Sequence, residues 1–210
     1  MHRFPFSRLL MLVMASTGLA ACGGNAPVLN VPVSAANAYL LTSNNRIIGV
    51  DLDDLEYARS VVPVKQATTA STPTAPTPDD ALEMGEIILD IDFRNSEGRL
   101  YALTRKGTQG RIIIIEPRTG LITRVSTLTA DAADNVGEVA LYAGLSTTAN
   151  YTIDFNPMVD RLRIIGSDGS NLRVDALTGE TITDTNIMPA GSNVSGIAYR
   201  DDFNLTPGAG

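Results

Sequence analysis

Short apolar runs separated by polar turns recur in the same order in two stretches of the chain. The runs of the first stretch are 86–93, 99–106, 111–117 and 121–128. Those of the second stretch are 151–155, 161–167, 172–177 and 181–187. The intervening turns are rich in Gly, Asn and Asp, which is typical of β-strands joined by tight turns. The pattern predicts two units of four antiparallel strands, and any helical turn is expected within 131–145, where β-branched residues are few.

The two units also match at particular positions. The matches are IDF at 91–93 and 153–155, RL at 99–100 and 161–162, and TG at 119–120 and 178–179. Each Thr-Gly pair is predicted to end a hairpin, where Gly supplies a positive φ. Residues 38–54 are a partial copy, and a fourth copy begins at residue 196 with GIAYRDDFN. Four-stranded antiparallel units repeated at roughly 40–50 residues are typical of β-propeller blades. We therefore expect an all-β, propeller-like array, and a β-sandwich or meander is the alternative fold.

The array is expected to be incomplete. Residues 38–210 supply three full or partial units and one strand of a fourth, whereas closed propellers have roughly 4–8 blades. The sequence therefore predicts either a truncated chain or an open sheet edge that pairs with another copy.

The N-terminus has the parts of a secretory signal. Arg3 and Arg8 precede the uncharged, mostly apolar run at 9–19, which is too short for a membrane-spanning helix of roughly 20 residues. The following residues 19–23, LAACG, resemble the lipobox of bacterial lipoproteins, in which the cysteine is lipidated and becomes the first residue of the mature chain. Ordinary cleavage after Ala21, beside a chance cysteine, is the alternative.

The lipobox resemblance sets the organisation that we expect. Residues 1–21 are the signal peptide, 22–37 a tether, and 38–210 the repeat domain, with a disordered Thr/Pro-rich insertion at 65–83. Lipid on Cys22 would anchor the protein to the membrane, since each buried CH₂ contributes about 0.8 kcal/mol. Gly23, where Asp would retain an enterobacterial lipoprotein in the inner membrane, favours the outer membrane. The expected location is the bacterial cell envelope.

Removal of the signal changes the composition that bears on function. The whole chain has 210 residues, a net charge of −7, one His and one Cys. Loss of residues 1–21 leaves 14 basic and 23 acidic residues, hence a net charge of −9, with no His and a lipidated Cys. The negative charge argues against a nucleic-acid partner. Without imidazole or free thiol, Ser-His-Asp and Cys-His catalysis and His- or Cys-based metal sites are excluded.

Carboxylates, a Lys or Tyr base, or a hard cation bound by oxygen remain as possible chemistry. Asp92 and Asp154 stand out because the repeats place each between an Ile and a Phe, on the opposite face of a strand. There they either accept backbone N–H groups in the interior or face solvent.

Other polar clusters lack a specific motif. Residues 167–171, SDGSN, offer oxygen ligands for Ca²⁺ but lack the loop pattern of an EF-hand, so a turn is the simpler interpretation. The remaining polar candidates are a solvated strand end at Asp51, Asp53 and Asp54 and a turn at 107–110. Arg94, Arg161 and Arg163, near Asp92, Asp154 and Asp160, are expected to form cross-strand ion pairs. We therefore assign no catalytic residue, cofactor or metal ligand, and only Cys22, the lipid attachment site, has a predicted role.

Three stretches of the repeats resemble an uncharacterised bacterial family, the domain of unknown function 4394. They are IDFRNSEGRLYALT at 91–104, TIDFNPMVDRLRIIGSDGSNLRVDALTGE at 152–180 and GIAYRDDF at 196–203. The resemblance covers 38–205, and its most specific part is DFNPMVDRLR at 154–163. Asn95, where the family usually has Pro, and the expanded 65–83 depart from the pattern. The resemblance implies an envelope or secreted location and a propeller-like fold, but no activity and hence no functional residues.

Two functions remain. The favoured one is a non-catalytic envelope lipoprotein, a structural or binding module whose repeat surface binds another protein, a glycan or a small ligand. The alternative is a Ca²⁺-dependent propeller hydrolase or lactonase-like enzyme. That enzyme would need several carboxylate or amide side chains, Asp92 and Asp154 among them, converging on one point.

Overall fold

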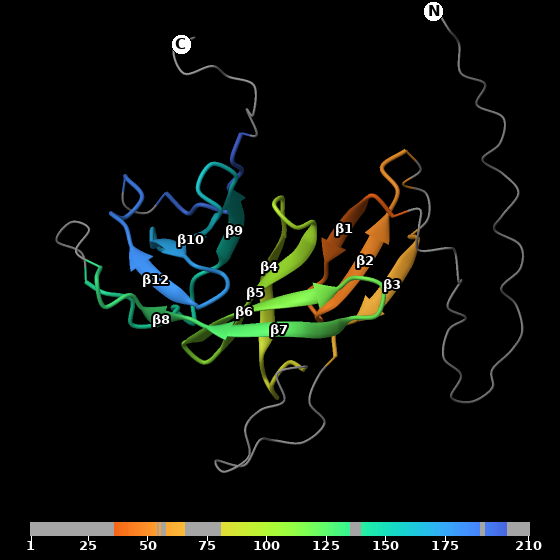
Figure 1. Cartoon of the computed structure of the whole chain (residues 1–210), viewed down its shortest axis with the longest axis horizontal. Coiled ribbons are helices and arrows are strands. Elements are labelled where there is room, and N and C mark those ends of the chain that lie inside the picture. The colour runs from red at the N-terminus through yellow and green to blue at the C-terminus, as the bar shows by residue number, and fades with distance from the viewer. Residues whose placement is uncertain are drawn as a thin grey trace, which may run out of the picture.

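The computed structural model of the protein describes residues 36–53, 55, 58–65, 81–134, 140–189 and 192–200. Twelve strands in these residues form three sheets, and no helix occurs among them (Figure 1). The predicted all-β class is therefore confirmed. The helical turn expected within 131–145 is wrong for the residues described there, which form a turn and an extended segment. The described part also holds no helix long and apolar enough to cross a membrane.

The strands of the three sheets follow the chain almost in order. The first sheet has the order β1(Ala38–Leu41), β2(Arg46–Val50), β3(Ser60–Pro63). The second has β4(Ile87–Arg94), β5(Arg99–Lys106), β6(Gln109–Glu116), β7(Leu121–Thr127). The third has β8(Thr129–Ala130), β12(Glu180–Thr183), β11(Asn171–Val174), β10(Arg161–Gly166), β9(Tyr151–Asn156), and only β8 and β12 are parallel. Each of the eight predicted apolar runs thus overlaps a strand.

Several segments of the expected organisation lie outside the described residues. They are the signal peptide, Cys22, the tether up to residue 35 and residues 66–80 of the insertion. At the borders of the insertion, the Leu82 N–H donates to the carbonyl oxygen of Lys65 at 2.9 Å. Leu82 is fully buried, so the insertion leaves and re-enters the fold at one point beside the core.

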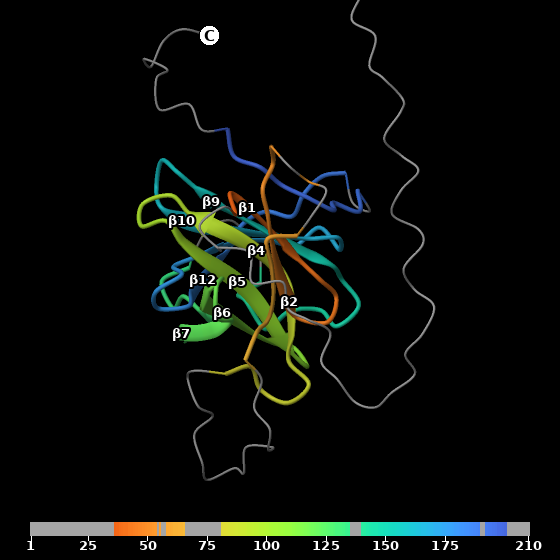
Figure 2. The ribbon, with the colours of Figure 1, turned by 90° about the vertical axis from the view of Figure 1, so that its right-hand side faces the viewer.

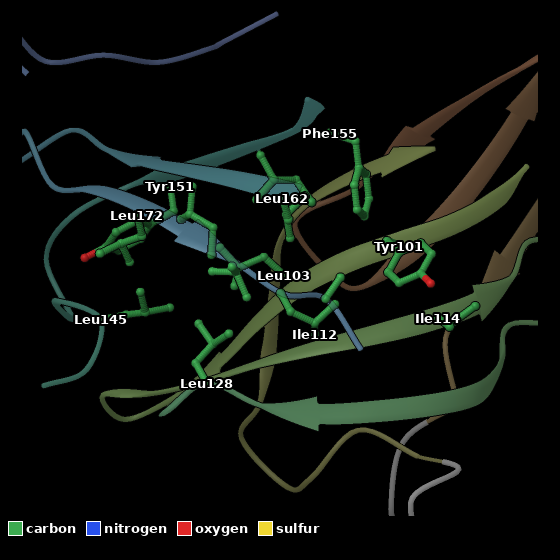
Figure 3. Close-up of a cluster of buried hydrophobic side chains, with 14 of the residues drawn as sticks. Tyr101, Leu103, Ile112, Ile114, Leu128, Leu145, Tyr151, Phe155, Leu162 and Leu172 are labelled. Atoms are coloured by element: carbon green, nitrogen blue, oxygen red, sulfur yellow. The ribbon is translucent and has the colours of Figure 1, made fainter. Parts of the chain in front are cut away.

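The second sheet lies between the other two, and both of its faces are therefore covered (Figure 1). In β6, Ile113 and Ile115 join the core cluster shared with the first sheet, whereas Ile112 and Ile114 join the cluster shared with the third (Figure 3). An uninterrupted apolar strand is what burial on both faces requires. We call the face of a sheet toward the preceding sheet its back face and the other its front face; Figure 2 views the molecule from the first sheet.

Equivalent aromatic pairs join each sheet to the next. Tyr39 of β1 packs on Phe93 of β4, with ring centroids 5.6 Å apart. Tyr101 of β5 packs on Phe155 of β9 in an edge-on arrangement, with centroids 5.1 Å apart. In both pairs the phenylalanine follows the tyrosine by 54 residues, so the two junctions repeat the same contact, and β1 corresponds to β5.

Two glycine turns make a second set of equivalent contacts. Gly120, between β6 and β7, has a φ of 71°, and Gly179, between β11 and β12, has a φ of 84°. A Cβ atom would lie 2.1 Å from the Pro63 carbonyl oxygen at the first turn and 1.9 Å from the Thr127 carbonyl oxygen at the second. Each turn needs glycine for its backbone conformation and for its approach to the preceding sheet. The predicted left-handed turns at the two Thr-Gly pairs are confirmed.

Candidate functional site

Strands β4 and β9 are the first strands of the two four-stranded units, and they lie side by side. Carboxylates of β4 connect the two strands. Asp90 Oδ2 accepts hydrogen bonds from the Thr152 hydroxyl at 2.9 Å and from the Ile153 N–H at 2.8 Å. Asp92 Oδ2 accepts one from the Phe155 N–H at 2.8 Å. Because β4 and β9 belong to different sheets, these N–H groups have no ladder partner on that side, and the carboxylates satisfy them.

The same contact occurs once more along the chain. Asp154 of β9 accepts a hydrogen bond from the Tyr199 N–H, just as Asp92 accepts one from Phe155. Residues 196–200 therefore run beside β9 as β9 runs beside β4. Of the two positions that the sequence left open for Asp92 and Asp154, the interior one that accepts backbone N–H groups is correct, and both side chains are half-buried.

The carboxyls of Asp92 and Asp154 ionise less readily than ordinary aspartates, because their pKa values are raised. Burial raises the pKa of Asp92 to about 6; the charges of Asp154 and Asp90 add to the rise, and the N–H bond from Phe155 opposes it. Burial also raises the pKa of Asp154, while the N–H bond from Tyr199 lowers it. Elevated carboxyl pKa values accompany both catalytic acids and structural clusters, so the geometry decides between them.

That geometry is one of structural links between strands. One oxygen of each carboxyl is occupied by a backbone N–H of the neighbouring strand. Among the residues that the structure describes, no group of three or more His, Cys, Asp or Glu is placed to hold a metal ion. The three aspartates thus lie together, as the alternative enzyme would require of Asp92 and Asp154, but their carboxyls connect successive repeats.

A second link lies between the hairpin of β4 and β5 and that of β9 and β10. Arg94 donates from Nε and Nη2 to Asp160 at 2.9 and 2.7 Å, and from Nη1 to Glu97 and the Tyr101 hydroxyl, each at 3.1 Å. Its guanidinium carbon lies 5.8 Å from the ring centroid of Phe155. The hydrogen bonds from Arg94 lower the pKa of Asp160, which keeps this carboxylate ionised and the two repeats joined.

Comparison with known proteins gives one match. A family model described as a domain of unknown function (DUF4394) matches residues 62–207, well over half of the chain. The chain belongs to the DUF4394 family. No curated protein and no solved structure matches it. The family model begins within β3, whereas the resemblance noted from the sequence began at residue 38, so β1 and β2 lie outside the matched range.

The weaker candidates of this DUF4394 chain have ordinary structural roles. Asp168 accepts from the Ser170 N–H at 3.1 Å and hydroxyl at 2.6 Å, which makes 167–170 a turn, as expected. Asp51 accepts from the Asn37 amide at 3.1 Å and lies 3.5 Å from Arg59. Residues 107–108 form the turn between β5 and β6.

The predicted arginine pairs exist: Arg94 binds Asp160, one of the expected acids, whereas Arg161 and Arg163 bind other aspartates. Arg94 binds across two sheets, as described above. Arg161 pairs with Asp175, and Arg163 with Asp184, within the third sheet. Asp184 also takes a bidentate contact from Arg173, at 3.0 and 2.6 Å. These arginines are neutralised by the protein's own carboxylates, which is unlike a clamp for an anionic substrate.

One buried ion pair was missed by the sequence analysis. Glu86, 1% exposed, accepts from Arg111 Nε and Nη2, each at 2.8 Å, and from the Glu83 N–H at 2.7 Å. The Thr104 hydroxyl also donates to it. An Arg on the apolar strand β6 was the available signal, since such a residue needs a buried acceptor. The pair fixes the chain where it returns from the insertion.

A cavity of about 300 Å³ opens on the front face of the third sheet. Its apolar lining comes from β10 and from the segment that leads to residue 200: Ile165, Ile187, Val194, Ile197 and Ala198. Arg163, Asn171 and Tyr199 complete it, and Arg163 Nε donates to the Tyr199 hydroxyl at 3.1 Å. The front faces of the other two sheets are covered by the sheet that follows them, and this cavity occupies the corresponding place on the front face of the third.

Proposed function

We propose that this DUF4394 protein is a lipid-anchored protein of the bacterial cell envelope, and that its propeller-like repeats are a non-catalytic binding or structural module. The observation that carries the second part is the use of Asp90, Asp92 and Asp154. These carboxylates are the best candidates for chemistry, because the chain expected after signal removal has no His and no free Cys. Each accepts a backbone N–H group of the neighbouring strand. They serve to join successive repeats.

The propeller-like arrangement is supported by the equivalence of successive junctions. Phe155 donates to Asp92 as Tyr199 donates to Asp154. The Tyr–Phe pairs and the two glycine turns repeat in the same way. First strands side by side and sheets stacked face to face are the arrangement from which propellers are built. We infer that further repeats of this kind complete the ring.

The alternative, a Ca²⁺-dependent hydrolase, has less support. Ca²⁺ takes six to eight oxygen ligands, whereas each of the three clustered carboxyls has one oxygen bonded to the backbone. Thermal unfolding with Ca²⁺, with Mg²⁺ and with a chelator tests this alternative. We expect the same melting temperature in all three, and a rise specific to Ca²⁺ that disappears in Asp92→Asn would favour the enzyme.

The anchor is tested by labelling with radioactive palmitate in a Gram-negative host. We expect the wild-type full chain to incorporate label and to sediment with outer membranes, because Leu19-Ala20-Ala21-Cys22 resembles a lipobox. Cys22→Ala should be unlabelled and soluble. Gly23→Asp is the matched control, since it should keep the label and move to the inner membrane. An unchanged membrane fraction for Cys22→Ala would refute the anchor.

A further inference from the structure

Among the described residues, the first sheet has no strand that corresponds to β4 of the second sheet and β9 of the third. Its strands β1, β2 and β3 correspond to β5, β6 and β7, because Tyr39 takes the place of Tyr101 in the aromatic pairs. The residues that follow β3 make the same contact as those that follow β7. The Lys65 N–H donates to the carbonyl oxygen of Gly120 at 2.9 Å, and the Thr129 N–H donates to the carbonyl oxygen of Gly179 at 3.0 Å. β5 pairs with β4 on its other edge, whereas no described strand pairs with that edge of β1.

Residues 196–200 are a first strand without the rest of its sheet. Tyr199 stands where Phe155 stands, since each donates its N–H to the aspartate of the preceding first strand. In the described residues, 196–200 belong to no sheet. The described residues thus include the last three strands of one repeat at one end of the array and the first strand of a repeat at the other.

The faces beside these strands are also complementary. The back face of the first sheet has a row of apolar residues in register, Leu40, Ile48 and Val61. Leu40 is 51% and Val61 42% exposed. Their counterparts on the second sheet include Ala102 and Ile113, which are in register and fully buried. The apolar row is therefore buried on the second sheet, whereas its counterpart on the first sheet is exposed at Leu40 and Val61.

The front face of the third sheet offers the matching surface. There, the cavity of about 300 Å³ is lined by Ile165, Val194 and Ile197. At the other two junctions, this place is filled by the back face of the sheet that follows. A back face carrying Leu40, Ile48 and Val61 has the chemistry that would fill it, and an exposed apolar row beside an apolar cavity is typical of an interface.

We propose that the first sheet of one copy of this chain packs against the third sheet of a second copy, with β1 pairing to residues 196–200 of that copy. The existing pairs Asp92–Tyr101 and Asp154–Arg163 fix the register. By equivalence, Ala198 faces Tyr39, and Ile197 faces Leu40. Made twice, this head-to-tail contact closes a two-fold ring. Three sheets from each copy give six in the ring, within the range of roughly 4–8 blades.

The proposal rests on the propeller-like arrangement but not on the lipid anchor. Its tests therefore use a soluble form that begins at residue 22 and carries Cys22→Ser, so a failure of anchoring leaves them unaffected. Light scattering after gel filtration should give a mass twice that of the chain. Leu40→Asp should halve this mass and leave a folded chain with an unchanged circular dichroism spectrum, because Leu40 is 51% exposed in the single copy. Met158→Asp, at a residue 80% exposed and outside the interface, should leave the dimer intact.

A disulfide tests the register directly. The Thr42 N–H, next to β1, donates to the carbonyl oxygen of Arg46 in β2 at 3.0 Å. Backbone groups alternate in direction along a strand, so the even-numbered residues of β1 form hydrogen bonds with β2. Leu40 therefore forms a non-hydrogen-bonded pair with the strand 196–200 of the second copy. Such pairs have Cα atoms about 4.5 Å apart, within disulfide range. Oxidised Leu40→Cys/Ile197→Cys should run as a covalent dimer, and the control Leu41→Cys/Ile197→Cys should not.

Three results would overturn the proposal. A monomeric mass for the soluble form would show that another occupant, such as further repeats or a different protein, covers these faces. A Leu40–Ile197 disulfide formed within one chain would show that three sheets close on themselves. Equal cross-linking of the test and control pairs would show that β1 and residues 196–200 do not pair in this register.

Discussion

Replacing Asp92 by Asn and by Ala separates its hydrogen bond from its charge. The amide in Asp92→Asn keeps an oxygen that accepts the Phe155 N–H, whereas the methyl group in Asp92→Ala leaves that N–H without its acceptor 2.8 Å away. Burial raises the pKa of Asp92 to about 6, so the ionised carboxylate is a cost to the fold that the neutral amide lacks. We therefore expect the two substitutions to change the free energy of unfolding in opposite directions at neutral pH.

The magnitudes follow from the pKa and the hydrogen bond. A pKa of about 6 instead of 3.8 corresponds to about 3 kcal/mol if fully expressed, and solvent screening of a half-buried carboxyl reduces this to about 1 kcal/mol. Asp92→Asn should therefore stabilise the protein by that amount above pH 7. Asp92→Ala should destabilise it by about 1–3 kcal/mol, the cost of an unsatisfied N–H.

The pH dependence has a definite sign. Between about pH 4 and 6 the folded protein holds a proton on Asp92 that the unfolded chain releases, so this contribution to stability is full below pH 4 and is lost as pH rises through 6. The amide in Asp92→Asn does not titrate. The gain of Asp92→Asn over the wild type should therefore be near zero at pH 4 and reach its plateau above pH 7.

Urea unfolding of the soluble form with Cys22→Ser, followed by circular dichroism at one protein concentration and several pH values, measures these differences. The chain has no Trp, so circular dichroism is the better probe. The reasoning is refuted if Asp92→Asn loses as much stability as Asp92→Ala, or if its difference from the wild type does not change between pH 4 and 8.

Three further substitutions test other contacts by the same urea assay. Glu86→Gln removes the buried partner of Arg111 and should cost about 3–5 kcal/mol; a loss under about 1 kcal/mol would contradict a stabilising pair. Gly179→Ala, whose Cβ would lie 1.9 Å from a carbonyl oxygen, should lower the free energy of unfolding far more than Gly98→Ala, where Gly98 has a φ of 64° but its Cβ would meet nothing within 4 Å. Asp160→Asn should cost about 0.5 kcal/mol at pH 7. Because its arginine partner lowers the pKa of Asp160, this difference should vanish as pH falls through that pKa, the reverse of Asp92.

The strands and their repetition were predictable because they follow from local chemistry. Apolar runs bounded by Gly, Asn and Asp specify strand and turn, and the run at 111–117 is typical of a sheet buried on both faces. The Thr-Gly pairs were identified as left-handed turns, but their contact with the preceding sheet was not. That contact depends on how neighbouring sheets stack, and the sequence of one strand and its turn carries no information about the stacking.

The partners of the charged residues were the least predictable part. Asp92 and Asp154 were singled out by their recurrence, yet periodicity alone left open whether they faced the interior or solvent. Arg94 meets Asp160 across 66 residues, and Glu86 meets Arg111 across 25. Pairs so distant along the chain are brought together by tertiary packing, so single-sequence reasoning finds the residue types but not the pairing.

The junctions that the chain makes within itself differ in kind from the one that it leaves open. Between the second and third sheets, carboxylates accept backbone N–H groups, and a bidentate Arg94–Asp160 pair joins the hairpins. Ala198 stands where Asp92 and Asp154 stand in the earlier first strands, so it offers no carboxylate to the sheet that follows it. A junction built there lacks this carboxylate link between strands. It should therefore form and separate more readily than the internal junctions, as a contact between copies must.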